Sequence, residues 1–265
     1  MMITVKTISA DLRAVREKSP LVHNITNFVV MNNTANALLA VGASPVMAHA
    51  VEEVTDMVNI ASALVINMGT LSPQWVEGMV DAGKAASTRG IPVVFDPVGV
   101  GATPYRNEVA ARIVSECKPT FIRGNASEIM ALAKENIVTK GVDSSASGNS
   151  AIEAAKRLAT ETGAIVVISG PEDFITDGTE VLSTKNGSTL MAKVTGMGCT
   201  ATAVLGAFAG VNANRLEAAT HAMAVMSIAG EIAATKSDGP GTMQLHFLDT
   251  LYNLNEADIE KTFKA

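Results

Sequence analysis

The feature that most constrains the fold of this 265-residue chain is the alternation of short apolar runs with longer segments of helical periodicity. The run Ala63-Leu-Val-Ile-Asn-Met68 is apolar almost throughout, which is typical of strands buried on both faces of a parallel sheet. A helical pattern from Pro73 to Arg89 follows it, and Ile91-Pro-Val-Val-Phe95 then repeats the apolar run. The chain therefore predicts successive strand and helix units around a parallel sheet.

Later segments extend this pattern and favour a three-layer α/β fold, with a mostly parallel central sheet and helices on both faces. Residues 138–150 are rich in Gly and Ser and have the composition of a domain linker. Because strand and helix units resume at once, we predict one domain over residues 1–265. We also expect a helix over Asn107–Cys117 and a hairpin around Asp177-Gly178.

Composition narrows the range of partners. Hydrophobic residues make up 48% of the chain, and the net charge of -6 leaves no basic stripe for nucleic acid. The sequence has neither a targeting signal nor an apolar run long enough to cross a membrane, so we expect a cytoplasmic protein without a membrane partner. Two cysteines, Cys117 and Cys199, are too few for a disulfide framework.

The segment Lys193–Ala203 is a glycine-punctuated turn that leads into a run of small and apolar residues with helical spacing. Gly196 and Gly198 let a ligand approach the backbone closely, and the first N–H groups of a helix attract anions. Phosphate is the natural ligand for such a turn, although a glycine-rich turn before a buried helix needs no ligand. Cys199 at the helix start is expected to have a lowered thiol pKa and could act as base or nucleophile, or serve only as a small hydrophobe.

Polar residues also cluster where predicted strands end. His23, Asn24, Thr26 and Asn27 follow one strand, where they could simply satisfy turn and cap hydrogen bonds. Asp96 follows another strand, at the sheet edge where parallel sheets bind ligands.

Several ordered motifs between Pro20 and Phe247 resemble one family. They are Pro20-Leu-Val-His-Asn-Ile-Thr-Asn27, Ala43-Ser-Pro-Val-Met47, Asp96-Pro-Val-Gly-Val-Gly101, Ile122-Arg-Gly-Asn-Ala-Ser-Glu-Ile129 and Gly196-Met-Gly-Cys199. The last resembles the anion-hole turn of ribokinase-like kinases, which usually ends in aspartate. A cysteine in its place is the pattern of the hydroxyethylthiazole kinases.

The resemblance implies a role for each matching residue. Asn27, Met47 and Gly196 would bind the substrate, and Arg123 and Ser169 the nucleotide. Asp96 and Glu128 would lie near Mg²⁺, whereas Cys199 would be catalytic. The residues implied as the anion hole are Gly196, Met197, Gly198 and Cys199, and Pro240-Gly-Thr242 resembles a loop on the nucleotide side.

The implied reaction transfers the γ-phosphoryl group of ATP to the hydroxyl of 4-methyl-5-(2-hydroxyethyl)thiazole, for thiamine biosynthesis or salvage. The family is also expected to form homotrimers with pockets at subunit interfaces, the Asn27 and Met47 segment facing the Cys199 turn of a neighbour. Two alternatives remain, namely another ribokinase-like small-molecule kinase and a non-catalytic thiazole or thiamine sensor. The chain lacks a Walker A motif.

The role of Cys199 can be tested with two substitutions. We predict that Cys199→Ala loses activity, whereas Cys199→Asp retains much of it, because aspartate is the usual occupant of this turn in the superfamily. Steady-state phosphorylation rates of both variants, with circular dichroism to verify folding, are the measurement. A folded but inactive aspartate variant would reject a function shared by the two side chains.

Overall fold

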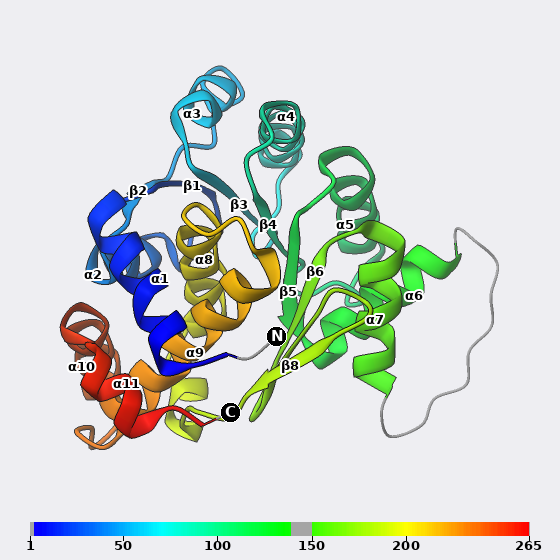
Figure 1. The fold of residues 1–265 in the computed structure, drawn as a ribbon. Coiled ribbons are helices and arrows are strands. Elements are labelled where there is room, and N and C mark those ends of the chain that lie inside the picture. The colour runs from blue at the N-terminus through cyan, green and yellow to red at the C-terminus, as the bar shows by residue number, and fades with distance from the viewer. Residues whose placement is uncertain (1–2, 139–149, 265) are drawn as a thin grey trace.

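The computed structural model describes residues 3–138 and 150–264, and its centre is one eight-stranded sheet in the order β2-β1-β3-β4-β5-β6-β7-β8 (Figure 1). Strands β1 to β6 pair in parallel, while β7 and β8 form an antiparallel edge. The strands span Leu21–Ile25 (β1), Ser44–Val46 (β2), Ala63–Asn67 (β3), Val93–Asp96 (β4), Phe121–Asn125 (β5), Ile165–Ser169 (β6), Asp173–Thr176 (β7) and Val181–Thr184 (β8).

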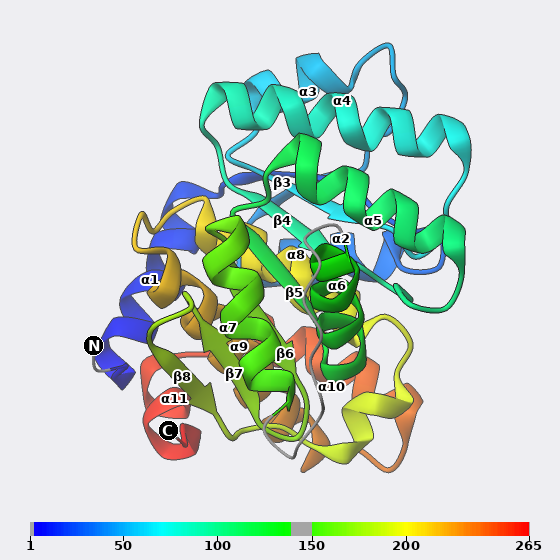
Figure 2. The same ribbon diagram turned by 90° about the vertical axis from the view of Figure 1, so that its right-hand side faces the viewer.

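Helices cover both faces of the sheet, as Figures 1 and 2 show from two directions. One layer consists of α3 (Val54–Ile60), α4 (Pro73–Arg89), α5 (Pro104–Cys117), α6 (Ala126–Val138) and α7 (Ser150–Thr162). The other consists of α1 (Val5–Lys18), α2 (Met31–Val41), α8 (Met197–Ala209), α9 (Arg215–Ala234), α10 (Pro240–Asn253) and α11 (Glu256–Thr262), with a 3₁₀ turn η1 (Thr189–Lys193) before α8. The predicted three-layer α/β fold is confirmed.

The two faces of each central strand belong to different cores. In β3, Leu64 and Ile66 pack with helices α3 to α7, whereas Val65 packs with the layer that contains α8. Successive side chains of a strand point to opposite faces, so a strand between two helical layers must be apolar at nearly every position. This explains the continuous apolar runs of the sequence.

Two expected boundaries were wrong, and both errors fall at a proline. Helix α5 begins at Pro104 rather than at Asn107, because the Oγ1 of Thr103 accepts a hydrogen bond from a backbone N–H of the first turn and caps the helix. The segment Pro240-Gly-Thr242 is the first turn of α10 and not a loop. Proline is favoured at the first helical position, where its missing N–H is not needed.

Other expectations have different outcomes. The hairpin is confirmed, with Gly178 in the left-handed region at φ 99°. Most of the Gly- and Ser-rich segment, residues 139–149, lies outside the described residues. Within the described ranges, the helices are all too short or too polar to cross a lipid bilayer.

Helix α8 lies directly against the sheet because of one glycine. A Cβ atom at Gly206 would lie 2.8 Å from Cγ2 of Val65 and 3.1 Å from Cγ1 of Val22, closer than real Cβ contacts normally allow. The helix can therefore approach β1 and β3 with its backbone, and α9 packs behind it. This close packing fixes where the N-terminus of α8 meets the sheet edge.

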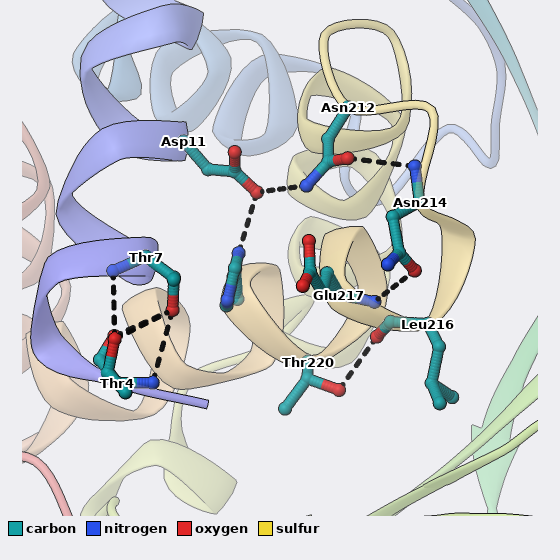
Figure 3. A network of polar contacts seen from close by, with 9 residues as sticks. Thr4, Thr7, Asp11, Asn212, Asn214, Leu216, Glu217 and Thr220 are labelled. Atoms are coloured by element: carbon teal, nitrogen blue, oxygen red, sulfur yellow. Dashed lines mark hydrogen bonds and ion pairs between the residues drawn. The ribbon is translucent and has the colours of Figure 1, made fainter. Parts of the chain in front are cut away.

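A polar cluster ties α1 to the α8–α9 connection (Figure 3). The Oδ2 of Asp11 accepts a hydrogen bond from Nδ2 of Asn212 at 2.7 Å and lies 2.6 Å from Nδ1 of His221. The His221 side chain is only 1% exposed, and its Nε2 has no hydrogen-bond partner among the described residues. Asp11 is thus the hydrogen-bond partner of Nδ1 of this buried ring.

We predict that Asp11→Ala lowers the free energy of unfolding by about 1–3 kcal/mol, because it leaves both a buried imidazole and the Asn212 amide without their acceptor. Urea unfolding followed by fluorescence measures the change. Asp81→Ala, at an exposed position on α4, is the matched control. Equal unfolding midpoints for the two variants would mean that the cluster adds no stability.

Candidate active site

A chain of side-chain hydrogen bonds joins the carboxyl ends of three neighbouring strands. Nδ2 of Asn27, just beyond β1, donates to Oδ1 of Asn67 in β3 at 2.8 Å. Nδ2 of Asn67 then donates to Oδ2 of Asp96 in β4 at 3.0 Å. All three side chains are at most 4% exposed. The polar residues that follow separate apolar runs in the sequence are therefore parts of one buried network.

Asp96 is the acceptor on which this network converges. Its Oδ2 also accepts a 2.6 Å hydrogen bond from Oγ1 of Thr202 on α8, and Nη1 of Arg123 approaches to 3.9 Å. Burial raises the pKa of Asp96 from 3.8 to about 6, although the charge of Arg123 and the two hydrogen bonds oppose that rise. No described residue forms a hydrogen bond with Oδ1.

The turn before α8 has the geometry expected of an anion-binding site. Gly196 is the N-cap of α8 with φ 84°, and a Cβ there would lie 2.7 Å from Cγ1 of Val30. The first intrahelical bond after the turn is donated by N–H of Thr200 to O of Gly196 at 2.8 Å. The N–H groups of Met197, Gly198 and Cys199 therefore remain available at the positive end of the helix dipole.

Arg123 lies against this turn. A Cβ at Gly198 would be only 2.9 Å from Nη1 of Arg123, so the glycine leaves room for the guanidinium group beside the helix start. The Arg123 side chain is 11% exposed, and its Nε is buried without a hydrogen-bond partner among the described residues. Donors of the turn and of the guanidinium are thus side by side, a combination suited to phosphate oxygens.

The thiol of Cys199 differs from the expectation. The helix start led us to expect a lowered pKa, but burial and the nearby carboxyl of Asp96 raise the pKa of this thiol. Nδ2 of Asn27 donates to Sγ at 3.5 Å, which opposes the rise without reversing it. In this structure Cys199 is a protonated thiol at neutral pH.

A cavity of about 710 Å³ opens beside the turn, and it contains both residues that the sequence assigned to the nucleotide. Arg123 and Ser169 line it, and Oγ of Ser169 is buried without a partner among the described residues. An apolar part is lined by Met191, Met197, Ala201, Met223 and Met226. The cavity therefore combines unsatisfied polar groups with flexible apolar side chains.

Glu128 lies at the start of α6 and is held by backbone groups. Its Oε1 accepts from N–H of Gly99 and its Oε2 from N–H of Asn125, both at 2.9 Å. Oδ1 of Asn125 accepts in turn from N–H of Glu128, so capping explains part of this motif. Among the residues described, no three His, Cys, Asp or Glu side chains gather as a metal-binding group.

Asn27 lies beside Cys199 of its own chain. The resemblance implied that the Asn27 and Met47 segment faces the Cys199 turn of a neighbouring subunit, whereas within one chain Nδ2 of Asn27 already donates to Sγ of Cys199 at 3.5 Å. Spacing along the sequence does not tell whether distant segments meet within a chain or between chains, so the interface implied by the resemblance stays a prediction. Met47 directly follows the edge strand β2, next to β1, and is half-buried. It takes no part in the described Asn27–Asp96 hydrogen-bond chain.

Comparisons with known proteins identify the family. A family model described as the hydroxyethylthiazole kinase family matches residues 12–257. A protein named hydroxyethylthiazole kinase from Syntrophus aciditrophicus (strain SB) is 55% identical over 265 residues, which cover 100% of this chain and 98% of that protein. The chain belongs to the hydroxyethylthiazole kinase family.

Comparison with solved structures supports the family assignment. The structure of hydroxyethylthiazole kinase from Pyrococcus horikoshii OT3 has a TM-score of 0.91 and 42% sequence identity, with 98% of each chain covered. A ribokinase-like superfamily protein from Enterococcus faecalis V583 has a TM-score of 0.66 at 12% identity, with 96% of each chain covered. At that identity the second likeness concerns the fold alone.

Two residues of this hydroxyethylthiazole kinase family member were missed in the sequence. Asn67 ends an otherwise apolar strand, just as Asp96 does, and that shared position was the available clue. Thr202 lies on α8, where a threonine among small residues indicates only helix packing. Its bond to Asp96 spans 106 positions of the chain, and no local pattern predicts such a contact.

The raised pKa of Asp96 predicts a pH-dependent effect of Asp96→Asn on stability. Between the usual 3.8 and about 6 the folded chain retains a proton that the unfolded chain loses, so this group costs stability as pH rises through that window. Without magnesium or nucleotide, we expect the variant to be more stable than wild type at pH 8, by on the order of 3 kcal/mol at most, and little different at pH 4.

Urea unfolding at the two pH values measures this difference, with the exposed Asp81→Asn as the control. A stability gain that is the same at both pH values would contradict a raised pKa at Asp96.

Proposed function

We propose that this protein transfers the γ-phosphoryl group of ATP to the hydroxyl of 4-methyl-5-(2-hydroxyethyl)thiazole and so forms the thiazole phosphate used in thiamine biosynthesis. One observation carries the proposal: the guanidinium of Arg123 lies against Gly198, beside the free N–H groups of the α8 turn. Phosphoryl transfer depends on positioning and on neutralising charge, which these groups supply.

ATP would occupy the 710 Å³ cavity. Its apolar part, with Met223 and Met226, suits a flat heteroaromatic base. Arg123 and Ser169 would bind phosphate oxygens, since both have a buried polar atom with no partner among the described residues. The transferred phosphoryl group would then lie at the anion hole of Gly196, Met197, Gly198 and Cys199.

The thiazole alcohol would bind on the other side of the turn, near Asn27, Met47 and Gly196. Because Nδ2 of Asn27 donates to Sγ of Cys199, the sulfur is an acceptor there and its own proton is free to point toward another group. With its pKa raised, the thiol is better suited to orient the substrate hydroxyl than to remove its proton. Cys199 is therefore proposed as the catalytic residue that positions the reacting oxygen.

Mg²⁺ is proposed to bind between Asp96 and Glu128. Oδ1 of Asp96 accepts no hydrogen bond from a described residue, whereas both oxygens of Glu128 already accept one. The two carboxylates therefore offer few direct ligands, which suits Mg²⁺ because this ion usually keeps water and phosphate oxygens as its other ligands. When bound, the ion would neutralise charge on the phosphate oxygens. Asp96 would have to be ionised for this role.

We further propose that residues 1–265 form one cytoplasmic domain that assembles as a homotrimer. Phe28 and Val29, which follow Asn27 directly, are 64% and 66% exposed and offer an apolar surface beside the acceptor side. Since Asn27 and Cys199 meet within one chain, a neighbouring subunit would complete the pocket from outside.

The decisive test is ATP consumption by the purified protein with magnesium, with and without hydroxyethylthiazole. Hydroxymethylpyrimidine and pyridoxal are the competing acceptors, and binding of the thiazole is measured separately by calorimetry. We expect strong stimulation by the thiazole alone. Stimulation by another acceptor would favour a different ribokinase-like kinase, whereas thiazole binding without turnover would favour a sensor.

A further inference from the structure

Arg106 on α5 holds the loops that follow two neighbouring strands. Its Nη1 donates to the carbonyl oxygen of Met68 at 2.7 Å and to that of Val98 at 2.6 Å, and its Nη2 donates to that of Gly69 at 2.8 Å. Met68 and Gly69 follow β3, and Val98 follows β4. A single nitrogen therefore bridges the two loops.

The loop after β3 borders the proposed acceptor side. N–H of Gly69 donates to Oδ1 of Asn67, and a Cβ at Gly69 would lie 2.6 Å from Nδ2 of Asn27. Oγ1 of Thr70 accepts from N–H of Phe28 at 3.2 Å, which joins this loop again to the segment after β1. A shift of the loop would therefore move Asn27, which is the hydrogen-bond partner of Cys199.

The loop after β4 borders the proposed phosphoryl side. It begins directly after Asp96, the last residue of β4, and N–H of Gly99 donates to Oε1 of Glu128 at 2.9 Å. The guanidinium packs on this loop as well, since a Cβ at Gly99 would be 3.4 Å from Nε and Nη1 of Arg106. A shift here would move both proposed magnesium-binding carboxylates relative to the acceptor.

We propose that Arg106 is a positioning residue that sets the spacing between the acceptor side and the phosphoryl side of the site, an inference that rests on the proposed kinase function. Arginine suits this role because its rigid planar fork offers several donors at fixed angles. All three acceptors are backbone carbonyls, and no ion pair of Arg106 is found within the described residues. The contacts therefore fix backbone positions rather than neutralise a carboxylate.

Helix α5 supplies a matched control in Arg112. That side chain forms ion pairs with Glu77 and Glu116, and its recorded contacts include neither loop. Arg106→Gln and Arg112→Gln remove the same charge from the same helix. Because only Arg106 contacts the two loops, only the first substitution should loosen the site.

The experiment compares these two variants with the wild-type full-length protein. Turnover is followed as thiazole-dependent ADP release, and affinities for the thiazole and for a non-hydrolysable ATP analogue are measured separately by calorimetry. We expect Arg106→Gln to lower kcat about 10- to 100-fold, because misplaced reacting groups lose rate steeply, while each separate affinity changes about threefold or less. Arg112→Gln should retain wild-type kcat.

Chemical rescue separates positioning from a general loss of folded protein. In Arg106→Ala, millimolar methylguanidinium should occupy the vacated space and restore part of kcat, with no effect on Arg112→Gln. Arg106→Lys keeps the charge but lacks the planar fork, so its kcat should lie between those of the wild type and Arg106→Gln. This variant replaces the other two in the test if they do not fold.

Three results would overturn the proposal. The first is a kcat of Arg106→Gln equal to that of Arg112→Gln. The second is a fall in kcat matched by an equal fall in calorimetric binding stoichiometry, without rescue. The third is wild-type kcat in Arg106→Lys. If the wild-type protein itself does not phosphorylate the thiazole, the proposed function fails instead.

Discussion

The site depends on one buried carboxylate. Asp96 is 2% exposed, and burial of a charge is costly unless donors surround it. Asn67 on β3 and Thr202 on α8 provide those donors. One precedes Asp96 in the sequence and the other follows it. The Thr202 bond ties α8 to the end of β4, and the Asn67 bond ties β3 to the same carboxylate, so the N-terminal turn of α8 and the two strand ends share one reference point.

Two glycines make this arrangement possible because side chains occupy the space where their Cβ atoms would be. At Gly69 the amide of Asn27 fills that space, and at Gly198 the guanidinium of Arg123 does. In each case a side chain proposed to bind substrate or nucleotide packs directly on backbone. Neither of these two glycines has a positive φ, in contrast to Gly196, so their role is to allow close approach rather than a left-handed backbone.

Much of the fold could be predicted from the sequence, since strands buried on both faces leave a continuous apolar run and exposed helices leave a periodic one. Asp96 and the glycine turn were also visible, because strand ends and helix starts have local signatures. The arrangement of Asn27 against Cys199 was not, and neither was the raised pKa of the thiol. Both arise from tertiary burial, which local spacing does not encode.

The contact between Asn27 and Cys199 joins residues that are 172 positions apart in the chain. Closing so large a loop has an entropic cost, which the pairing of the intervening strands offsets by bringing the two segments together. The segments that form the site cannot be assembled by any small part of the chain, since Asn27 precedes β2 and Cys199 follows β8. Competence for catalysis therefore requires most of the chain, from the segment after β1 to the start of α8.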